Sequence, residues 1–116
     1  MKHIAITLIC LIAILVYTVA SYIYIDGFHD EMTEKISSLQ NNEYYDGDVM
    51  LLISGFERHK KALRIMVNEE LVDETDKLLT ELEYDARYNN IQNAETHCAL
   101  ILNNIKEIKR TSHTLY

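Results

Sequence analysis

Two histidines of this sequence, His59 and His97, could carry chemistry, because imidazole exchanges protons and binds metals near neutral pH. A zinc site would need carboxylates or thiolates beside them, but the sequence contains neither a His-Glu-x-x-His nor a Cys-x-x-Cys pattern. Charged residues flank His59 on both sides, which predicts a solvated helix face. His97 precedes Cys98, which predicts a packing or surface role rather than a ligand. We therefore expect no metal and no cofactor.

The candidate nucleophiles lack the partners that nucleophilic catalysis requires. Ser54 precedes Gly55 but lies in no strand–turn–helix pattern of the kind that exposes a catalytic serine. Cys98 has apolar neighbours, and a buried free cysteine usually behaves as a small hydrophobe. Cys10 lies in a distant apolar segment, so we expect no disulfide within the chain, while a bond between two chains stays open. We predict no catalytic residue.

An acidic stretch over residues 69–85 could bind calcium or a basic partner. It lacks the alternating oxygen ligands and the central glycine of a calcium loop. We expect instead a solvated helix face, partly paired with the basic residues that precede it, in which each exposed pair contributes about 0–1 kcal/mol.

Aromatic side chains are the remaining candidates for recognition. They could line a groove for a partner, although in a small helical domain such residues more often form the core and its rim. The predicted interaction residues are Tyr44, Tyr45, Phe56, Tyr84 and Tyr88.

An uncharged run over residues 4–25 determines on which side of a membrane all these residues lie. As a helix it is about 33 Å long, enough to cross a hydrocarbon core of roughly 30 Å. Lys2 precedes the run, and Asp26 and Asp30 follow it. Because basic residues beside a span stay in the cytoplasm, we predict a cytoplasmic N-terminus, a single-pass anchor over residues 1–25, and residues 26–116 outside the cell membrane.

A cleaved signal peptide is the alternative interpretation of this run. Thr18, Val19 and Ala20 form a small-residue cleavage signal after an apolar region of suitable length. The apolar stretch nevertheless continues past Ala20, and tyrosines at its outer end suit an interfacial aromatic belt. We predict a retained anchor, and a mature chain that starts at Ser21 stays open.

One face of the run could join two copies of the chain. Small and aromatic residues recur there at helical spacing, and small residues allow helices to approach closely in a membrane. Mixed apolar residues also align in this way by chance. The residues of this face are Cys10, Ala13, Tyr17, Ala20 and Tyr24.

The part after residue 25 is acidic. The chain has 18 acidic and 11 basic side chains, and of these only Lys2 lies before residue 26. Nucleic-acid binding needs clustered Lys and Arg to neutralise phosphates, so we expect no nucleic-acid partner.

The sequence predicts an all-α fold, because it has no proline, only three glycines, and apolar residues at helical spacing. We expect helices over about residues 28–40, 46–66, 69–88 and 91–111. The first continues the membrane helix, although Gly27 within it costs about 1 kcal/mol relative to alanine. Asp46 or Asp48 and Asn68 are the expected caps. Short connections favour antiparallel neighbours, so we predict a small antiparallel bundle.

Four apolar seams form the predicted core. The first helix contributes Phe28, Met32, Ile36 and Leu39. The second contributes Tyr45, Val49, Leu52, Phe56, Leu63 and Met66. The third contributes Leu71, Leu78 and Leu82, with Leu79 beside them and its acidic residues, Asp85 included, in water. The fourth contributes Ala94, Cys98, Ile101, Ile105 and Ile108.

The order of these features resembles an uncharacterised bacterial family of short membrane-anchored helical proteins, described as a domain of unknown function. The likeness spans nearly the whole chain: the N-terminal span, the opening Asn42-Glu43-Tyr44-Tyr45, the junction Asn68-Glu69-Glu70-Leu71 and the alanine-containing last helix. That family often has a histidine before the Glu-rich junction, where this chain has Asn68. The resemblance implies a single span and a helical bundle, and it brings no established activity.

We therefore expect a non-enzymatic interaction or structural module, tethered outside the membrane, whose partner is another protein of the bacterial cell envelope. The alternative is a sensor whose bundle holds a small ligand or signal molecule near Phe56, Tyr84 or Cys98. A membrane-active toxin is a third hypothesis, disfavoured because most of the chain lies outside the span. An enzyme is the least expected class.

Overall fold

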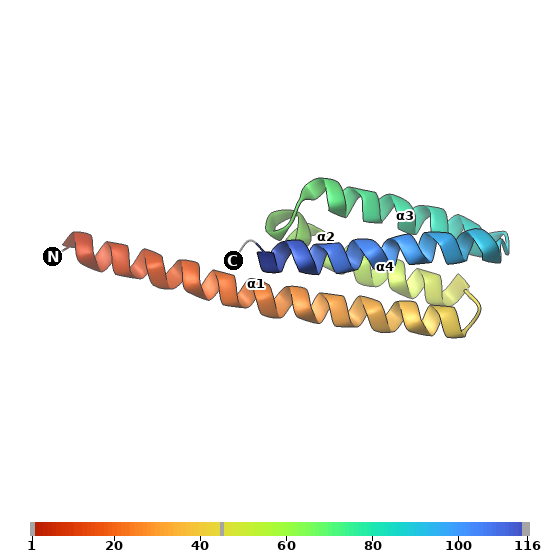
Figure 1. Ribbon diagram of the computed structural model, residues 1–116, viewed down its shortest axis with the longest axis horizontal. Coiled ribbons are helices and arrows are strands. Elements are labelled where there is room, and N and C mark those ends of the chain that lie inside the picture. The colour runs from red at the N-terminus through yellow and green to blue at the C-terminus, as the bar shows by residue number, and fades with distance from the viewer. Residues whose placement is uncertain (1, 45, 115–116) are drawn as a thin grey trace.

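The computed structural model describes residues 2–44 and 46–114, and the regular structure of this part is helical throughout. Its elements are α1 (Lys2–Asn41), α2 (Asp46–Met66), α3 (Glu69–Arg87) and α4 (Ile91–Thr114). Each helix packs against the next, and α4 packs back against α1, so the four form a closed ring around one core. Figure 1 shows the antiparallel bundle and the N-terminal part of α1 projecting from it. The predicted all-α bundle is confirmed, with helix ends within a few residues of those expected.

Helix α1 is continuous from the uncharged run into the bundle, as predicted. It is long and apolar enough to cross a membrane by length and composition. Its apolar side chains are exposed between Ile4 and Val19, whereas Ser21, Ile25 and Phe28 are buried. The bundle therefore begins to cover α1 at residue 21, a few residues before the expected end of the anchor. The whole molecule extends 67 Å along this helix and 22 by 21 Å across it.

Two ends of the bundle are distinguished below. The distal end comprises the α1–α2 and α3–α4 connections, residues 42–44 and 88–90, with the adjoining helical turns. The proximal end comprises the α2–α3 connection, residues 67–68, with the adjoining turns of α2 and α3, the last turns of α4, and α1 at residues 21–25. Figure 1 shows α1 projecting beyond the proximal end, beside the C-terminal end of α4.

The predicted seams of α1 and α4 form the core as expected, and that of α2 does so at Val49, Leu52, Phe56 and Leu63. All predicted positions of α1 and α4 are buried, and Ile25 extends the α1 stripe toward the N-terminus. In α2, Phe56 is fully buried and its ring centroid lies 6.2 Å from that of Phe28. Met66 is half-buried, and Tyr45 lies outside the described residues.

The predicted seam of α3 is partly wrong. The buried side chains of this helix are Val72, Thr75, Leu79, Leu82 and Asp85. Leu71 and Leu78 pack on the flank of the core instead of inside it. The helix is turned because Asp85 has a partner inside the bundle, and because the Thr75 hydroxyl donates to the Leu71 carbonyl at 2.8 Å. A buried polar group is tolerated when it is hydrogen-bonded, so polar residues can occupy the inner face.

The α2–α3 corner is fixed by the predicted cap. The Asn68 side-chain oxygen accepts a hydrogen bond from the Glu70 amide at 2.9 Å, which satisfies one of the unpaired donors at the start of α3. This bond and the acidic first turn of α3, Glu69 and Glu70, set where the chain reverses at the proximal end.

The two glycines Gly27 and Gly55 provide a test of the continuous α1. A Cβ at Gly27 would meet nothing within 4 Å, so Gly27→Ala should raise the free energy of unfolding by about 1 kcal/mol through helix propensity alone. A Cβ at Gly55 would lie 2.9 Å from Met32 Cε, so the gain from Gly55→Ala should be smaller. Thermal unfolding of the full-length chain in detergent micelles, followed by circular dichroism, measures both. No gain from Gly27→Ala would contradict a helix that is continuous at this position.

Candidate functional site

His97 joins α4 to two carboxylates of α3 near the distal end. Its Nε2 lies 3.0 Å from Glu81 Oε2, and its Nδ1 is hydrogen-bonded to Asp85 Oδ2. The Asp85 side chain is only 5% exposed, and the imidazole is 22% exposed. An imidazole N–H donates to a carboxylate oxygen, which accepts. His97 is thus the group that allows a carboxylate inside the bundle, and not only a packing residue.

His59 makes a second polar cluster, near the proximal end between α2 and α1. Its Nδ1 lies 2.5 Å from Tyr24 Oη and its Nε2 lies 2.6 Å from Glu31 Oε2. The Arg58 guanidinium donates to the other Glu31 oxygen at 3.2 Å, and the Phe28 ring meets the imidazole edge-on at 5.4 Å. The predicted solvated face for His59 is therefore wrong, because α1 supplies polar partners that the sequence of α2 cannot reveal.

The geometry of these clusters suits helix pairing. Each histidine bridges two helices, and among the described residues neither ring nitrogen is hydrogen-bonded to a serine or cysteine nucleophile. Within residues 2–44 and 46–114, no group of three or more His, Cys, Asp or Glu is placed to hold a metal ion. Burial raises the pKa of the Cys98 thiol to about 11, so the reactive thiolate is disfavoured at neutral pH.

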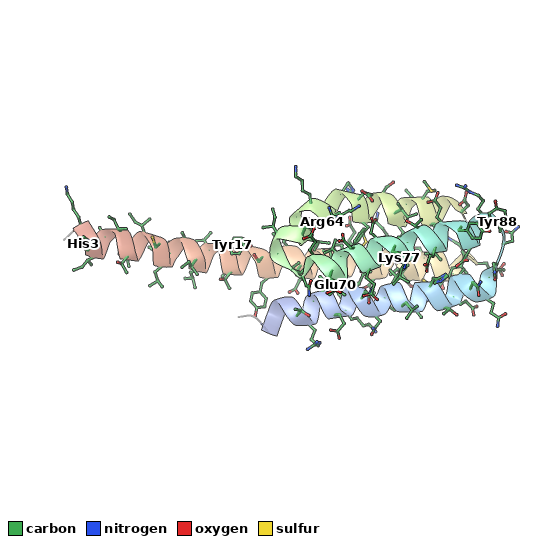
Figure 2. The ribbon with its side chains drawn as sticks, turned by 90° about the horizontal axis from the view of Figure 1, so that it is seen from above. His3, Tyr17, Arg64, Glu70, Lys77 and Tyr88 are labelled. Carbon is green, nitrogen blue, oxygen red and sulfur yellow. The ribbon has the colours of Figure 1, made fainter. Side chains whose placement is uncertain are left out.

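Tyr84 and Tyr88 form an exposed aromatic pair on α3 at the distal end. Their ring centroids lie 4.6 Å apart, and the residues are 63% and 64% exposed. Figure 2 shows Tyr88 at the end of the bundle away from His3 and Tyr17. Other exposed apolar residues in the first turns of α2 and α4 are Met50, Leu51 and Ile91. Exposed tyrosines carry a large apolar area and a polar tip, the combination enriched at protein interfaces.

Tyr44 lies at the same end, in the α1–α2 connection. Glu43 and Tyr44 both have left-handed backbones, with φ of 55° and 61°, and the Tyr44 amide donates to the Leu39 carbonyl at 2.9 Å. This turn packs the half-buried tyrosine ring against the core. Burial raises the pKa of the Tyr44 phenol, and nearby Cys98 and Glu95 add to the shift.

A small cavity of about 150 Å³ lies beside Tyr44. It lies between the two connections at the distal end, because residues of both the α1–α2 and the α3–α4 connection line it. The lining residues are Glu43, Tyr44, Asp85, Ala86, Asn89, Ile91 and Ala94.

The structure brings only part of the predicted interaction set together. Tyr84 and Tyr88 are adjacent, and Tyr44 belongs to the same end of the bundle. Phe56 is 1% exposed and lies in the core, and Tyr45 falls outside the described residues. The i,i+4 pair Glu81 and Asp85 was the available signal for the His97 cluster, but its partner on α4 depends on helix register.

A larger cleft of about 450 Å³ lies between α1 and α2. Three carboxylates and one amine face it, so it is predominantly acidic. The lining residues are Glu31, Glu34, Lys35, Ser38, Asn42, Asp48 and Leu51.

No known protein family, curated protein or solved structure matches this chain. The resemblance to the uncharacterised membrane-anchored family therefore stays a prediction. The function has to be argued from the geometry above.

The His97 cluster predicts a stability difference between buried and exposed ion pairs. His97→Ala leaves the buried Asp85 carboxylate without its partner, which should lower the free energy of unfolding by about 1–3 kcal/mol. The matched control is Arg87→Ala, which breaks the exposed i,i+4 pair with Glu83 and should cost about 0–1 kcal/mol. Chemical unfolding in detergent measures both. Equal effects would show that the His97 pair does not stabilise the α3–α4 packing.

Cys98 predicts a loss of stability at high pH. Its pKa is raised from 9.0 to about 11 in the folded chain, so the contribution is complete below pH 9 and is lost as the pH rises through 11. The midpoint of thermal unfolding should fall less steeply across this window in Cys10→Ser/Cys98→Ala than in Cys10→Ser. Parallel pH profiles for the two variants would contradict a buried, protonated Cys98.

Proposed function

We propose that this protein is a non-enzymatic interaction module of the bacterial cell envelope. In this proposal α1 crosses the cytoplasmic membrane once, residues 26–116 lie outside, and the distal end of the bundle binds another envelope protein. The observation that carries the proposal is the continuity of α1, which ends at Asn41. It places the distal end about 24 Å beyond the last residue of the uncharged run.

The exposed apolar part of α1 supports the membrane location. Soluble proteins rarely expose a contiguous apolar surface of this extent, whereas a helix in lipid satisfies every backbone polar group within itself. Lys2 before the run and the acidic residues after it favour a cytoplasmic N-terminus. A retained anchor is favoured over cleavage because the apolar run continues past Ala20 to Ile25.

The distal end is the surface that we propose for the partner. It combines the exposed Tyr84–Tyr88 pair with acidic side chains of α2, α3, α4 and the α1–α2 connection: Glu43, Asp46, Asp48, Glu95 and Glu83, the last paired with Arg87. Such a surface suits a partner that presents basic side chains around an apolar centre. Complementary charge increases the association rate and the selectivity, while buried aromatic side chains supply most of the affinity.

Site-specific photocross-linking in cells that carry the protein tests the location of this surface. A photoreactive phenylalanine in place of Tyr88 should give a discrete adduct with one envelope protein. The matched control is the same replacement of Lys77, which is exposed on α3 but lies nearer the middle of the bundle (Figure 2). Equal adducts at both positions, or none at Tyr88, would contradict a distal binding surface.

The purified pair then tests the role of the tyrosines. Tyr84→Ala should weaken the Kd about tenfold, or about 1.4 kcal/mol, because the exposed ring would be buried in the complex. The Kd of Lys77→Ala should stay within about twofold of the unchanged chain. An unchanged Kd for Tyr84→Ala would remove the aromatic pair from the interface.

A small-ligand sensor is the second candidate, and the acidic cleft between α1 and α2 is the observation that favours it. The predicted ligand position near Phe56 and Cys98 is filled by core side chains. The cleft offers instead Glu34 and Asp48 to a small cation. The two functions separate by position, since Glu34→Gln would weaken a ligand in the cleft and Tyr84→Ala would not.

A further inference from the structure

We infer that the proximal end of the bundle rests in the head-group region of the membrane that α1 crosses, with the last turns of α2 as its lipid contact. This inference rests on the proposed function, because it takes α1 as a membrane span. It adds a second membrane contact to the anchor, made by a part of the chain outside the uncharged run.

The bundle and the apolar surface of α1 overlap along the helix. Ser21 and Ile25 are buried by the bundle, yet Ile23 between them is 68% exposed on the outer face. The part of the uncharged run that the bundle leaves uncovered, residues 4–20, is about 25 Å of helix. This length is short of the roughly 30 Å hydrocarbon core. Burying Ile23 and matching the bilayer thickness both draw the proximal end down to the lipid head groups.

The last turns of α2 have the side chains that such a contact needs. Ile65 is 74% exposed, the highest value for a large apolar side chain in the described part of the chain. The exposed Lys61 and Arg64 precede it on the same helix, one turn and one residue earlier. Figure 2 places Arg64 near the end of the bundle from which α1 projects. An apolar residue beside long cationic side chains is typical of interfacial segments, where the cations reach phosphates and the apolar group enters the acyl boundary.

The charges at this end indicate which lipid group is bound. Arg64 pairs with Asp73 at 2.6 Å, whereas Lys61 makes no ion pair among the described residues. On α4, Lys109 lies 3.7 Å from Asp26, and Arg110 pairs with Glu107. Glu69 and Glu70 add negative charge at the start of α3. Because the proximal end carries both positive and negative side chains, the lipid group that it binds is the phosphate that every phospholipid carries. The contact therefore requires no excess of anionic lipid.

Tryptophan fluorescence tests this contact directly, because the natural chain has no tryptophan. Single-tryptophan variants of the full-length chain are reconstituted in phosphatidylcholine vesicles whose acyl chains are brominated near the head group or near the bilayer centre. Ile12→Trp reports the span, Ile65→Trp reports the proposed contact, and Leu100→Trp is the control, an exposed apolar position on α4 away from both bundle ends. Unchanged helical circular dichroism checks that each variant is folded.

Ile65→Trp should be quenched by the shallow bromines at least threefold more than Leu100→Trp, with a blue-shifted emission. Ile12→Trp should be quenched most by the deep bromines. Quenching of Ile12→Trp without quenching of Ile65→Trp would overturn this inference and leave the anchor standing. No quenching of Ile12→Trp would overturn the proposed span itself. A blue shift of Ile65→Trp without quenching would assign Ile65 to a contact with protein, such as a second copy, and would also overturn the inference.

Discussion

The unbroken backbone hydrogen bonding of α1 is the constraint on which the rest of the structure depends. One helix supplies both the exposed apolar segment and a full side of the core, from Ile25 to Leu39. Nothing in the sequence interrupts it, since the chain has no proline and Gly27 sits in open space. Because a helix is stiff over this length, the bundle cannot swing about the exposed apolar segment as it would on a flexible linker. Any orientation that α1 takes is passed to α2 and α4, which pack directly on it.

The histidine clusters fix the axial position of neighbouring helices relative to one another. Apolar packing alone specifies this register only weakly. An apolar seam can slide by a helical turn and still bury similar side chains, whereas a buried carboxylate finds its donor at one position only. His97 with Asp85 sets α4 against α3 near the distal end, and His59 with Glu31 sets α2 against α1 near the proximal end. The two clusters thus hold two different helix pairs at opposite ends. A slip of α4 against α3 would leave the buried Asp85 carboxylate without its partner.

Sequence reasoning predicted what depends on local pattern and missed what depends on contacts between helices. The pattern of apolar residues was sufficient to predict where the helices begin and end. It was also sufficient to predict the buried residues of α1 and α4, which recur at regular intervals. It was insufficient for α3, because Leu71 and Leu78 are as apolar as Leu79 and Leu82, which face the core. The deciding residue was Asp85, whose burial is explicable only once His97 is known to lie opposite. The same limit applies to His59, since its charged sequence neighbours say nothing about Tyr24 and Glu31 on another helix.

Charged and aromatic side chains differ between the two ends of the bundle because of the order in which the helices pack on α1. Antiparallel packing brings the C-terminal turns of α2 and α4, which are rich in Lys and Arg, to the end from which α1 projects. The same packing brings the acidic first turn of α2 and the tyrosines at the end of α3 to the opposite end, together with Arg87. Basic side chains suit the C-terminal turns because of the helix dipole, so this polarity needs no separate cause. A bundle built in this order directs the cations of α2 and α4 toward the end from which α1 projects, whereas α3, which runs the other way, places Glu69 and Glu70 there and Arg87 at the distal end.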